Sequence, residues 1–308
     1  MITVVICTYN RKQYLKLAID SILNQTISLD LIELIIIDNN STDGTRELVE
    51  KYFKDIDIHC KYILETNQGL SYCRNTGIAE SKHGYIAYLD DDGIAEPNWL
   101  ELMLNVISEN NEMFACATGD VVPIWEIPRP DWLIPLYDIY YSIFQLSNDR
   151  FIFTSEEIHT PAGGNVVYNK EVLLKFGGFN TKLGRNNKNL LSGEETLLHK
   201  QMIKNGYELI YIPEIRIKHH IHKSRISRYW LLRRYFWGGY SINVINRIEN
   251  EQSIFPIFFD TLFNVYKIFF NILLLPVGFL FKPRFYYMIY LTRISKSLGI
   301  IYSLMTRK

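Results

Sequence analysis

Two acidic clusters stand out in the sequence because their side chains could bind a metal ion or move a proton. Asp90, Asp91 and Asp92 are consecutive, and three adjacent carboxylates repel one another unless a cation compensates them. A hard divalent ion such as Mg²⁺ or Mn²⁺ takes oxygen ligands of this kind and bridges them to phosphate groups. The alternative is a solvated acidic turn before the helix expected after Pro97. Because the triplet directly follows a hydrophobic run, we favour the metal site.

The second acidic cluster is the pair Glu194 and Glu195, at the start of an expected helix. A carboxylate at this position can take a proton from a hydroxyl group in a cleft. Alternatively, both glutamates only stabilise the helix by lying at the positive end of its dipole, which is worth about 0.3–1 kcal/mol. The sequence alone leaves both interpretations open.

Histidines form a further cluster at His219, His220 and His222. A His-rich run is typical of metal binding, but no further Cys or His stands at the spacing of a zinc site. For His219 and His222 a basic surface patch is an equally good interpretation.

The elements that must position these residues follow a βαβ rhythm through the first 120 residues. The β-branched hydrophobic runs that predict strands are residues 2–6, 34–37, 61–64, 85–89 and 114–117. The segments of helical periodicity between them are residues 14–23, 45–53, 70–79 and 98–107. The sequence therefore predicts an α/β fold with a mostly parallel, Rossmann-like sheet that is covered on both faces.

The pattern is less regular further along the chain. Residues 121–141 contain four prolines and are expected to form a loop. A short strand at 166–168, a helix at 194–204 and a strand pair at 208–212 and 215–218 complete the expected α/β unit.

Polar segments follow each of the first four expected strands, at residues 8–11, 38–44, 67–69 and 90–92. In sheets of this kind, ligands bind in the crevice at the carboxyl ends of the strands, so these segments are expected to converge on one cleft. The sequence has neither a GxxxxGK[ST] nor a GxGxxG motif to hold phosphates. A diphosphate bound through a metal ion remains as the expected ligand.

Taken together, these motifs resemble those of the family 2 glycosyltransferases, which have the GT-A fold. The matching motifs, which lie in order within about residues 1–225, are TYNR at 8–11, DNNSTDGT at 38–45, NQG at 67–69 with Arg74 and Asn75, the aspartate triplet, and GEE at 193–195 followed by Leu197 and Gly206-Tyr207. The resemblance implies an inverting transfer of a sugar from a nucleotide-diphosphate sugar to a hydroxyl of a saccharide or polyprenyl-linked acceptor, in bacterial surface or extracellular polysaccharide biosynthesis. It also implies Mn²⁺ or Mg²⁺ as the cofactor.

The resemblance further implies roles for individual residues. The residues implied to bind the nucleotide-sugar are Thr8, Tyr9, Asn10, Arg11, Asp38, Asp43, Asn67, Arg74, Asp90, Asp91, Gly163, Gly164, Asn165 and Arg225. Asp92 is implied as the main metal ligand, with Asp90 and His220 beside it. Glu195 is implied as the catalytic base and Glu194 as its reserve, although the family more commonly carries Asp at the second position. The loop at 161–165 could instead be a plain tight turn.

Two other functions share some of these features. A sugar nucleotidyltransferase would use the same sheet and metal ion, but it would not need the base at Glu195 or an apolar tail. A non-catalytic nucleotide-sugar-binding protein would keep the affinity for the nucleotide without turnover. We favour the transferase because the sequence carries both halves of its site.

The composition divides the chain into two parts with opposite charge. The 308 residues contain 33 basic and 33 acidic side chains, but residues 1–214 hold 18 basic and 30 acidic ones while residues 215–308 hold 15 and three. The 48% hydrophobic content excludes a disordered chain, and the four widely separated cysteines are expected to be small buried side chains in a reducing compartment. The N-terminus lacks the features of a secretory signal, which predicts that the chain starts in the cytoplasm.

We expect residues 226–308 to form a helical tail on the cytoplasmic face of the cell membrane, peripheral or monotopic. The segment from 225 to 247 interleaves basic residues, all of them Arg, with aromatic residues, as interfacial anchors do, and residues 254–281 are strongly apolar. The longest uncharged stretch there, 268–281, is 14 residues, whereas a spanning helix needs about 20, so an in-plane or re-entrant element fits better. The alternatives are ordinary core helices or a dimer interface. Nucleic acid is not expected as a partner, because the cleft is acidic, and the sequence specifies no oligomeric state.

Overall fold

The computed structural model describes residues 1–54, 58–109, 112–154, 160–186, 188–250, 254–281 and 286–306. By the density of its internal contacts the chain divides into two compact units. The first comprises Met1–Ile124, Ser142–Thr181 and Glu194–His220. The second comprises Trp125–Tyr141, Lys182–Gly193 and Ile221–Lys308. The C-terminal unit thus includes two segments from within the first 225 residues.

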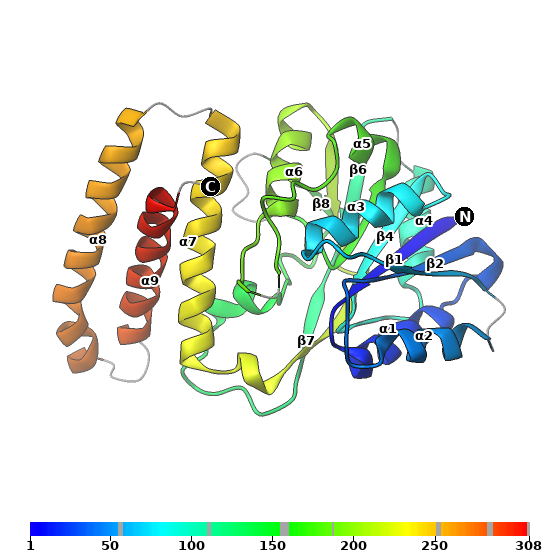
Figure 1. Ribbon diagram of the computed structural model, residues 1–308, viewed down its shortest axis with the longest axis horizontal. Helices are drawn as coiled ribbons and strands as arrows, with labels where there is room; N and C mark the ends of the chain where they lie inside the picture. Colours follow the sequence, from blue (N-terminus) through cyan, green and yellow to red (C-terminus); the bar gives the residue numbers. More distant parts are fainter. Residues whose placement is uncertain are drawn as a thin grey trace. The chain divides into compact units, whose positions relative to one another are not determined.

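An eight-stranded sheet forms the core of the first unit, in the order β3-β2-β1-β4-β9-β6-β10-β8 (Figure 1). Its strands are β1 (Ile2–Thr8), β2 (Ile32–Asp38), β3 (His59–Leu64), β4 (Tyr85–Asp90), β6 (Phe114–Thr118), β8 (Phe151–Ile152), β9 (Asn165–Asn169) and β10 (Glu208–Tyr211). Strands β1 to β4 pair in parallel, and so do β6 and β10, whereas β9 lies antiparallel between β4 and β6. The predicted α/β class with a mostly parallel sheet is confirmed.

Helices connect the parallel strands and supply the rest of the hydrophobic core of the first unit. They are α1 (Lys12–Leu23), α2 (Thr45–Lys54), α3 (Leu70–Glu80), α4 (Trp99–Glu109), α5 (Lys170–Lys175) and α6 (Glu194–Lys204), with a 3-10 turn η1 at Leu29–Leu31. In α1, Leu15, Ala18, Ile19 and Ile22 are buried, which is the spacing of one helix face. The helices predicted at 14–23, 45–53, 70–79, 98–107 and 194–204 are therefore all present, with ends that differ by at most two residues.

A second, three-stranded sheet has the order β5 (Gly93–Ala95), β11 (Ile217–Ile221) and β7 (Val121–Trp125). The prediction of a loop or irregular excursion over residues 121–141 is confirmed for residues 126–134, which form neither helix nor strand, but it is wrong at both ends, where β7 and a 3-10 turn, η2 (Pro135–Tyr141), lie. A strand containing Pro123 is possible because β7 is an edge strand, where a missing amide donor costs little. The strands expected as a pair near 208 and 215 belong to different sheets, β10 to the large one and β11 to the small one.

The second unit is built mainly from three long helices, α7 (Arg228–Asn250), α8 (Ile254–Phe281) and α9 (Tyr286–Met305), preceded by a 3-10 turn η3 (Lys223–Arg225). Helix α9 packs against both α7 and α8. The expected helical tail is therefore present. Among the described residues, no helix combines the length and the apolar character needed to cross a membrane.

All four cysteines are free. Cys73 and Cys116 are buried, as expected, whereas Cys7 and Cys60 are half-buried. Burial raises the pKa of the Cys60 and Cys116 thiols, which keeps both protonated near neutral pH.

Candidate functional site

The carboxyl ends of β1, β2 and β4 bring the first cluster of polar side chains together. Strand register places Thr8 beside Asp38 and Cys7 beside Asp90. The hydroxyl of Thr8 donates to Oδ2 of Asp91 at 2.9 Å. The predicted convergence of the segments after these strands is therefore seen in the structure.

Arg11 compensates two of the three aspartates. Its Nη1 donates to Oδ1 of Asp91 at 2.9 Å and to Oδ2 of Asp92 at 2.8 Å. Burial would lower the pKa of Arg11, but the two carboxylates raise it above its ordinary value. Burial raises the pKa of Asp91 to about 6, against the opposing effect of Arg11. Asp91 is thus largely ionised at pH 7, and it shares one guanidinium with Asp92.

The three aspartates differ in their access to solvent. Asp91 and Asp92 are buried, whereas 40% of the Asp90 side chain is exposed. Asp90 forms an ion pair with Arg74, whose Nη2 lies 3.9 Å from Oδ1 of Asp90. Asp90 is therefore the carboxylate of the triplet that is most open to a ligand.

Strand β11 places His219 and His220 beside Asp92. The Nε2 atom of His219 lies 3.2 Å from Oδ1 of Asp92, and His219 is only 3% exposed. A surface patch is thus the wrong interpretation for His219. The side chain of His220, which was predicted near the metal, is half-buried and packs against Tyr14 of α1, with ring centroids 5.4 Å apart. Its backbone N–H donates to the carbonyl of Asp92, and its role as a ligand stays a prediction.

Strand alternation is the signal that could have identified His219. Side chains at every second position of a strand point to the same side of the sheet. Ile217, His219 and Ile221 are all buried, with the more exposed Lys218 and His220 between them. His222, by contrast, is part-exposed and lies 3.7 Å from Glu126.

The loops after β1, β2 and β3 are shaped by the side chains that were predicted to bind the nucleotide. Asp38 is buried and accepts from the backbone N–H of Ser41 and from the Tyr62 hydroxyl at 2.7 Å. Asn10 has a φ of +52° and its side chain accepts from the N–H of Thr42. These bonds fix the loops in place, and contact with a nucleotide stays a prediction.

Asp43, Asn67 and Tyr9 complete this group. Asp43 accepts from the backbone N–H of Lys12 at 3.0 Å and from the Thr45 hydroxyl at the start of α2. The side-chain amide of Asn67 donates to Glu65 at 2.9 Å. Tyr9 is half-buried. Their predicted contacts with the nucleoside and phosphates also stay predictions.

Arg74 organises the second half of the site from helix α3. It is 3% exposed, its Nη1 donates to Oε1 of Glu194 at 2.9 Å, and the same nitrogen lies 3.6 Å from Oε2 of Glu195. The ring of Phe179 packs against its guanidinium at 5.3 Å. Since Arg74 also approaches Asp90, one buried cation connects the glutamate pair with the aspartate triplet. The sequence motif suggested Arg74 as a ligand of the donor, but not this connecting position.

The two glutamates compete for one guanidinium, which separates their pKa values. Burial and the neighbouring charge of Glu195 raise the pKa of Glu194 to about 8. Burial acts against ionisation of Glu195 too, but Arg74 together with hydrogen bonds to the carboxylate lowers the pKa of Glu195 to about 2. The Glu195 side chain is also more exposed, at 23% against 3% for Glu194. The pair therefore holds one proton near neutral pH, and Glu195 is the ionised member.

His199, one turn along α6 from Glu195, was not identified from the sequence. It is fully buried, and its Nε2 lies 2.6 Å from the hydroxyl oxygen of Tyr168. Burial lowers its pKa to about 3, so the ring is neutral. A single histidine on a helix that also carries core residues gives no signal of such a contact in the sequence.

Two glycines allow the loop before β9 to lie against both halves of the site. A β-carbon at Gly163 would lie 2.7 Å from Oε1 of Glu195 and 2.8 Å from Nη2 of Arg74. A β-carbon at Gly164 would overlap the carboxylate of Asp90. The loop is therefore packed on the charged groups, more closely than a plain tight turn requires.

Asn165 and Arg225 have other surroundings. The side chain of Asn165 is fully buried, accepts from the Trp99 indole at 2.7 Å and donates to two backbone carbonyls, those of Asp120 and Ile215. These bonds tie β9 to the segments beside it, and a role in donor binding stays a prediction. Arg225 is buried in η3 of the second unit, where its carbonyl accepts from the Tyr141 hydroxyl. The predicted contact of Arg225 with phosphate also stays a prediction.

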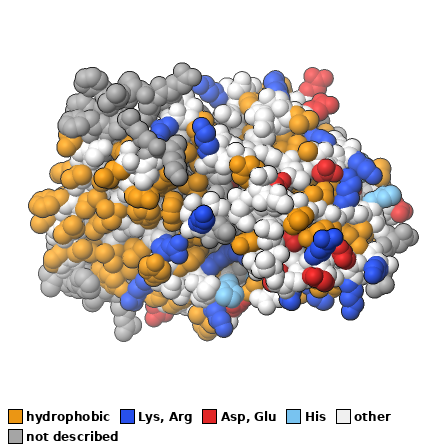
Figure 2. All heavy atoms as spheres, viewed as in Figure 1, with side chains coloured by type: hydrophobic (Ala, Val, Ile, Leu, Met, Phe, Trp, Pro, Cys, Tyr) orange, Lys and Arg blue, Asp and Glu red, His pale blue; other side chains and the backbone are white. Residues whose placement is uncertain are grey.

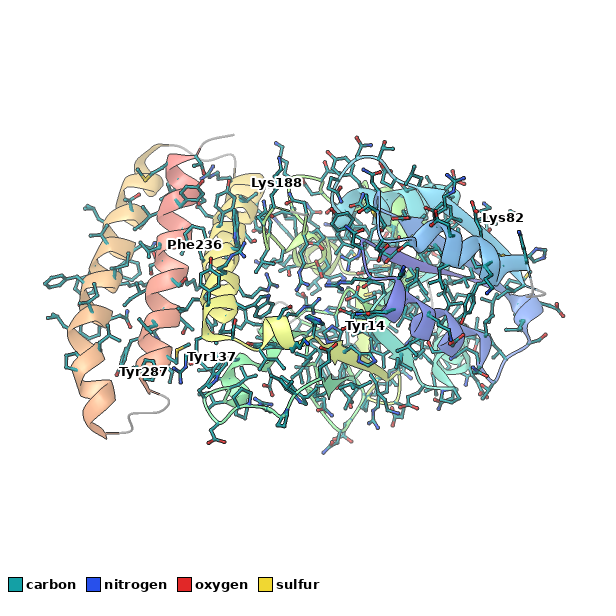
Figure 3. The ribbon with its side chains drawn as sticks, turned by 60° about the horizontal axis from the view of Figure 1, so that its bottom comes forward. Tyr14, Lys82, Tyr137, Lys188, Phe236 and Tyr287 are labelled. Carbon is teal, nitrogen blue, oxygen red and sulfur yellow. The ribbon has the colours of Figure 1, made fainter. Side chains whose placement is uncertain are left out.

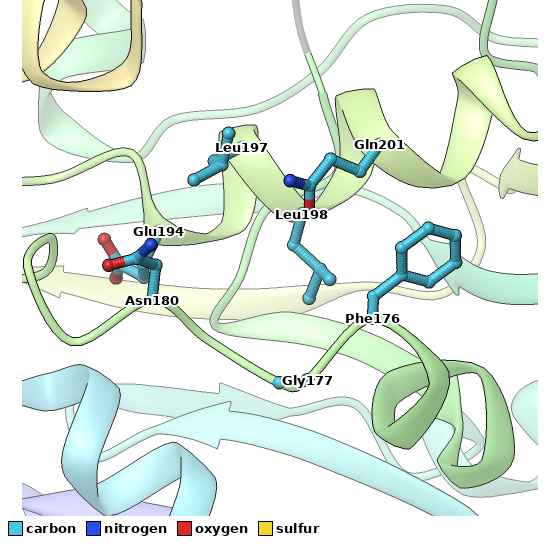
Figure 4. A pocket seen from close by; sticks show the side chains of 8 residues that line it. Phe176, Gly177, Asn180, Glu194, Leu197, Leu198 and Gln201 are labelled. Atoms are coloured by element: carbon cyan, nitrogen blue, oxygen red, sulfur yellow. The ribbon is translucent and has the colours of Figure 1, made fainter. Parts of the chain in front are cut away.

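A small pocket of about 120 Å³ opens beside Glu194 (Figure 4). The other residues that line it are Phe176, Gly177, Gly178, Asn180, Leu197, Leu198 and Gln201. Oε2 of Glu194 is buried and has no hydrogen-bond partner in the described part of the chain. The pocket thus combines an apolar wall with a few polar groups next to the glutamate pair.

The donor set and charge of the site fit a divalent cation. Within the described residues, no group of three or more His, Cys, Asp and Glu side chains is arranged as a complete metal site. Asp90 and Asp92 nevertheless supply the oxygen donors that Mg²⁺ and Mn²⁺ prefer, and substrate phosphates commonly complete such sites. Five carboxylates, two arginines and one bound proton leave about two negative charges at pH 7. One divalent ion would balance this charge.

Comparison with known proteins gives consistent results. Residues 3–177 match the model of the family described as glycosyl transferase family 2. The chain is 30% identical, over 259 residues, to the glucosyl-dolichyl phosphate glucuronosyltransferase of Haloferax volcanii, covering 82% of this chain and 79% of the relative. It is 34% identical over 116 residues to the putative teichuronic acid biosynthesis glycosyltransferase TuaG of Bacillus subtilis. This match covers 37% of this chain and 45% of the relative.

Solved structures with the GT-A fold are similar in architecture. The mannosyltransferase PcManGT of Pyrobaculum calidifontis, in complex with GDP-Man and Mn²⁺, has a TM-score of 0.59 at 17% identity and is matched over 82% of this chain and 64% of that one. S. aureus TarS 1-349 in complex with UDP has a TM-score of 0.56 at 15% identity. It is matched over 80% of this chain and 65% of that one. These similarities confirm the predicted GT-A fold.

Proposed function

Because the chain belongs to glycosyl transferase family 2, we propose that it transfers a sugar from a nucleotide-diphosphate sugar to an acceptor hydroxyl, with inversion and with the help of Mg²⁺ or Mn²⁺. The observation that carries the proposal is the position of Arg74 between two acidic groups. On one side lies Asp90 of the triplet, and on the other lie Glu194 and Glu195. The groups that we propose for donor binding and for proton transfer are therefore adjacent.

On the donor side, Asp90 and Asp92 would hold the cation, which would stabilise the negative charge that develops on the leaving diphosphate. Arg11 and Thr8 keep the neighbouring carboxylates in place through bonds of 2.8–2.9 Å. Because Gly164 packs on the Asp90 carboxylate, that carboxylate has little freedom to turn away from the site. The chain thus holds its donor-side carboxylates in a fixed arrangement before the substrate binds.

On the acceptor side, Glu195 would take the proton of the acceptor hydroxyl. The hydroxyl oxygen then forms a bond to the anomeric carbon while the bond from that carbon to the phosphate oxygen breaks, and the nucleoside diphosphate leaves. A single displacement of this kind inverts the anomeric centre. Arg74 keeps Glu195 ionised, and the protonated Glu194 anchors Arg74 without adding a second charge.

The relatives support the choice of substrates. The structures of PcManGT with GDP-Man and Mn²⁺ and of TarS with UDP support a nucleotide donor and a divalent cation. The Haloferax relative is named for a glucosyl-dolichyl phosphate, and TuaG for teichuronic acid biosynthesis. We therefore favour a saccharide or lipid-linked acceptor in the assembly of a surface or extracellular polysaccharide.

The test is release of nucleoside diphosphate by the full chain in mild detergent, with a panel of nucleotide-sugars, lipid-linked and saccharide acceptors, and Mn²⁺ or Mg²⁺. We expect metal-dependent release from one donor, reduced about 10²–10⁴-fold in Glu195→Gln, with nucleotide binding retained. Asp92→Asn should weaken binding of the cation and so raise the metal concentration needed for release. Glu171→Gln, an exposed glutamate in the first turn of α5, is the matched control and should keep full activity.

Two outcomes would contradict the proposal. Consumption of a nucleoside triphosphate with a sugar phosphate, with release of diphosphate, would indicate a nucleotidyltransferase. Binding of a nucleotide-sugar with no release in the presence of any acceptor would indicate a non-catalytic binding protein.

A further inference from the structure

Helix α8 has its polar side chains inside and its apolar side chains outside. Over residues 261–276, the buried side chains are Asn264 and Asn271, which are 5% and 6% exposed. Eight large apolar side chains of the same stretch are exposed by 46–63%: Leu262, Phe263, Val265, Tyr266, Phe269, Phe270, Ile272 and Leu273. A helix that packs on a protein core in water shows the opposite arrangement.

The exposed apolar side chains cover one continuous face. At 100° per residue they span about half of the helix circumference, centred opposite the two asparagines. Figure 2 shows hydrophobic side chains gathered over α8, and Figure 3 shows side chains of α8 extending away from α9. An exposed apolar patch of this size marks a surface that binds a membrane or another protein.

Helices α7 and α9 bury small and polar residues, as helices in lipid do, beside the apolar side chains of Leu231, Tyr235, Ile245 and Met288. A β-carbon at Gly239 would overlap the carbonyl of Lys296, and one at Gly299 would overlap the carbonyl of Phe236, so the two backbones approach closely. The buried polar residues of these helices are Ser241, Asn243, Thr292, Ser297 and Ser303. Among them, Asn243 donates to the Ser303 hydroxyl at 2.5 Å. In lipid, apolar side chains gain nothing by turning inward, so close packing and hydrogen bonds hold the helices together.

The charge of the unit indicates which surface the apolar face would meet. Residues 221–308 contain 13 basic and three acidic side chains. Arg233, Lys267 and Arg293, one from each helix, are exposed. The Nζ of Lys267 lies 4.1 Å from the ring of Phe263, so a cation stands directly at the edge of the apolar face. Basic side chains at the border of an apolar helix face are attracted to anionic lipid headgroups.

We propose that helix α8 lies in the plane of an anionic lipid bilayer, with the face formed by Leu262, Phe269 and Leu273 seated among the acyl chains and the exposed cations against the headgroups. A helix that lies in the plane of the bilayer places only one face in lipid, and about half of the circumference of α8 is apolar. The proposal concerns the second unit alone and does not depend on the proposed function.

Binding of the full chain to sedimented vesicles tests the proposal, with phosphatidylcholine vesicles with and without about a third phosphatidylglycerol. The variant Leu262→Gln/Phe269→Gln/Leu273→Gln removes three side chains from the centre of the apolar face. The matched control is Leu17→Gln/Ile152→Gln/Leu174→Gln, which removes three exposed apolar side chains of the first unit.

We expect the wild type and the control to bind the anionic vesicles, and the α8 variant to bind at least about tenfold more weakly. Replacing Arg233, Lys267 and Arg293 by glutamine should lower the affinity for anionic vesicles about fivefold per cation. The affinity for neutral vesicles should stay unchanged. Circular dichroism of each variant checks that the helices are retained.

Equal binding of the α8 variant and the wild type would overturn the proposal, as would a wild type that binds neither kind of vesicle. A wild-type dimer in solution that dissociates in the α8 variant, without vesicle binding, would assign this face to a second copy of the chain instead. The vesicle assay needs no turnover, so its failure is distinct from failure of the proposed sugar transfer.

Discussion

The proton shared by Glu194 and Glu195 makes stability depend on pH in a defined direction. In the unfolded chain a glutamate has a pKa of about 4.3, whereas the folded protein raises that of Glu194 to about 8. Between these values the folded state holds a proton that the unfolded state has lost, so the free energy of unfolding falls as the pH rises. From pH 6 to pH 9 the loss amounts to about 2.7 kcal/mol. The lowered pKa of Glu195, about 2, contributes stability that is lost only below pH 4.

Glu194→Gln should abolish this slope, and Glu195→Gln should reduce it, because burial still raises the pKa of Glu194. The first has no proton to lose, and the second removes the like charge that raises the pKa of Glu194. Urea unfolding of wild type and variants from about pH 6 to pH 9 measures the effect as a difference between curves, so that groups common to all proteins cancel. Glu171→Gln should keep the wild-type slope. If the free energy of unfolding changes with pH equally in all four proteins, the shared proton is refuted, whatever the activities of the variants.

Three further changes test other contacts. Gly164→Ala forces its methyl group into the neighbouring aspartate carboxylate and should lower turnover about 100-fold, whereas Gly84→Ala, which meets no atom within 4 Å, should leave it unchanged. Arg11→Met leaves two buried carboxylates uncompensated and should lower the free energy of unfolding by about 1–3 kcal/mol, part of which added Mg²⁺ recovers in thermal unfolding. Gly299→Ala should speed hydrogen exchange in α7 and α9 by separating their backbones, whereas Gly238→Ala, with one ring contact at 3.8 Å, should not.

The large sheet could be predicted from the sequence because its strands are strongly patterned. All seven residues of β2 are buried, and Leu34–Ile37 within it form the continuous hydrophobic run seen in the sequence. Short strands carry no such signal: β5 has three residues and β8 has two, and tertiary pairing alone defines them. Strand β7 was missed because Pro123 is read as a breaker, and only its place at the edge of the small sheet makes the proline acceptable.

The site could be predicted only in part, for a similar reason. That polar segments after parallel strands converge follows from the topology, so Thr8 and Asp91 could be placed together in advance. The contacts of Arg74 could not be predicted, because Glu194 lies 120 residues away along the chain and the pairing depends on how α6 packs. The role of Arg11 was equally hidden, since a polar loop residue gives no indication of which carboxylates it meets.

The charge balance of the site argues that donor and cation bind together. A nucleotide diphosphate is an anion, and the site retains about two negative charges at pH 7 after Arg11, Arg74 and the shared proton are counted. A donor alone would meet repulsion from Asp90, the most exposed of the three aspartates. A divalent cation removes that repulsion, and by linkage the donor raises the affinity for the cation by the same factor. The two arginines already pair with carboxylates, so we expect the proposed cation to supply this charge.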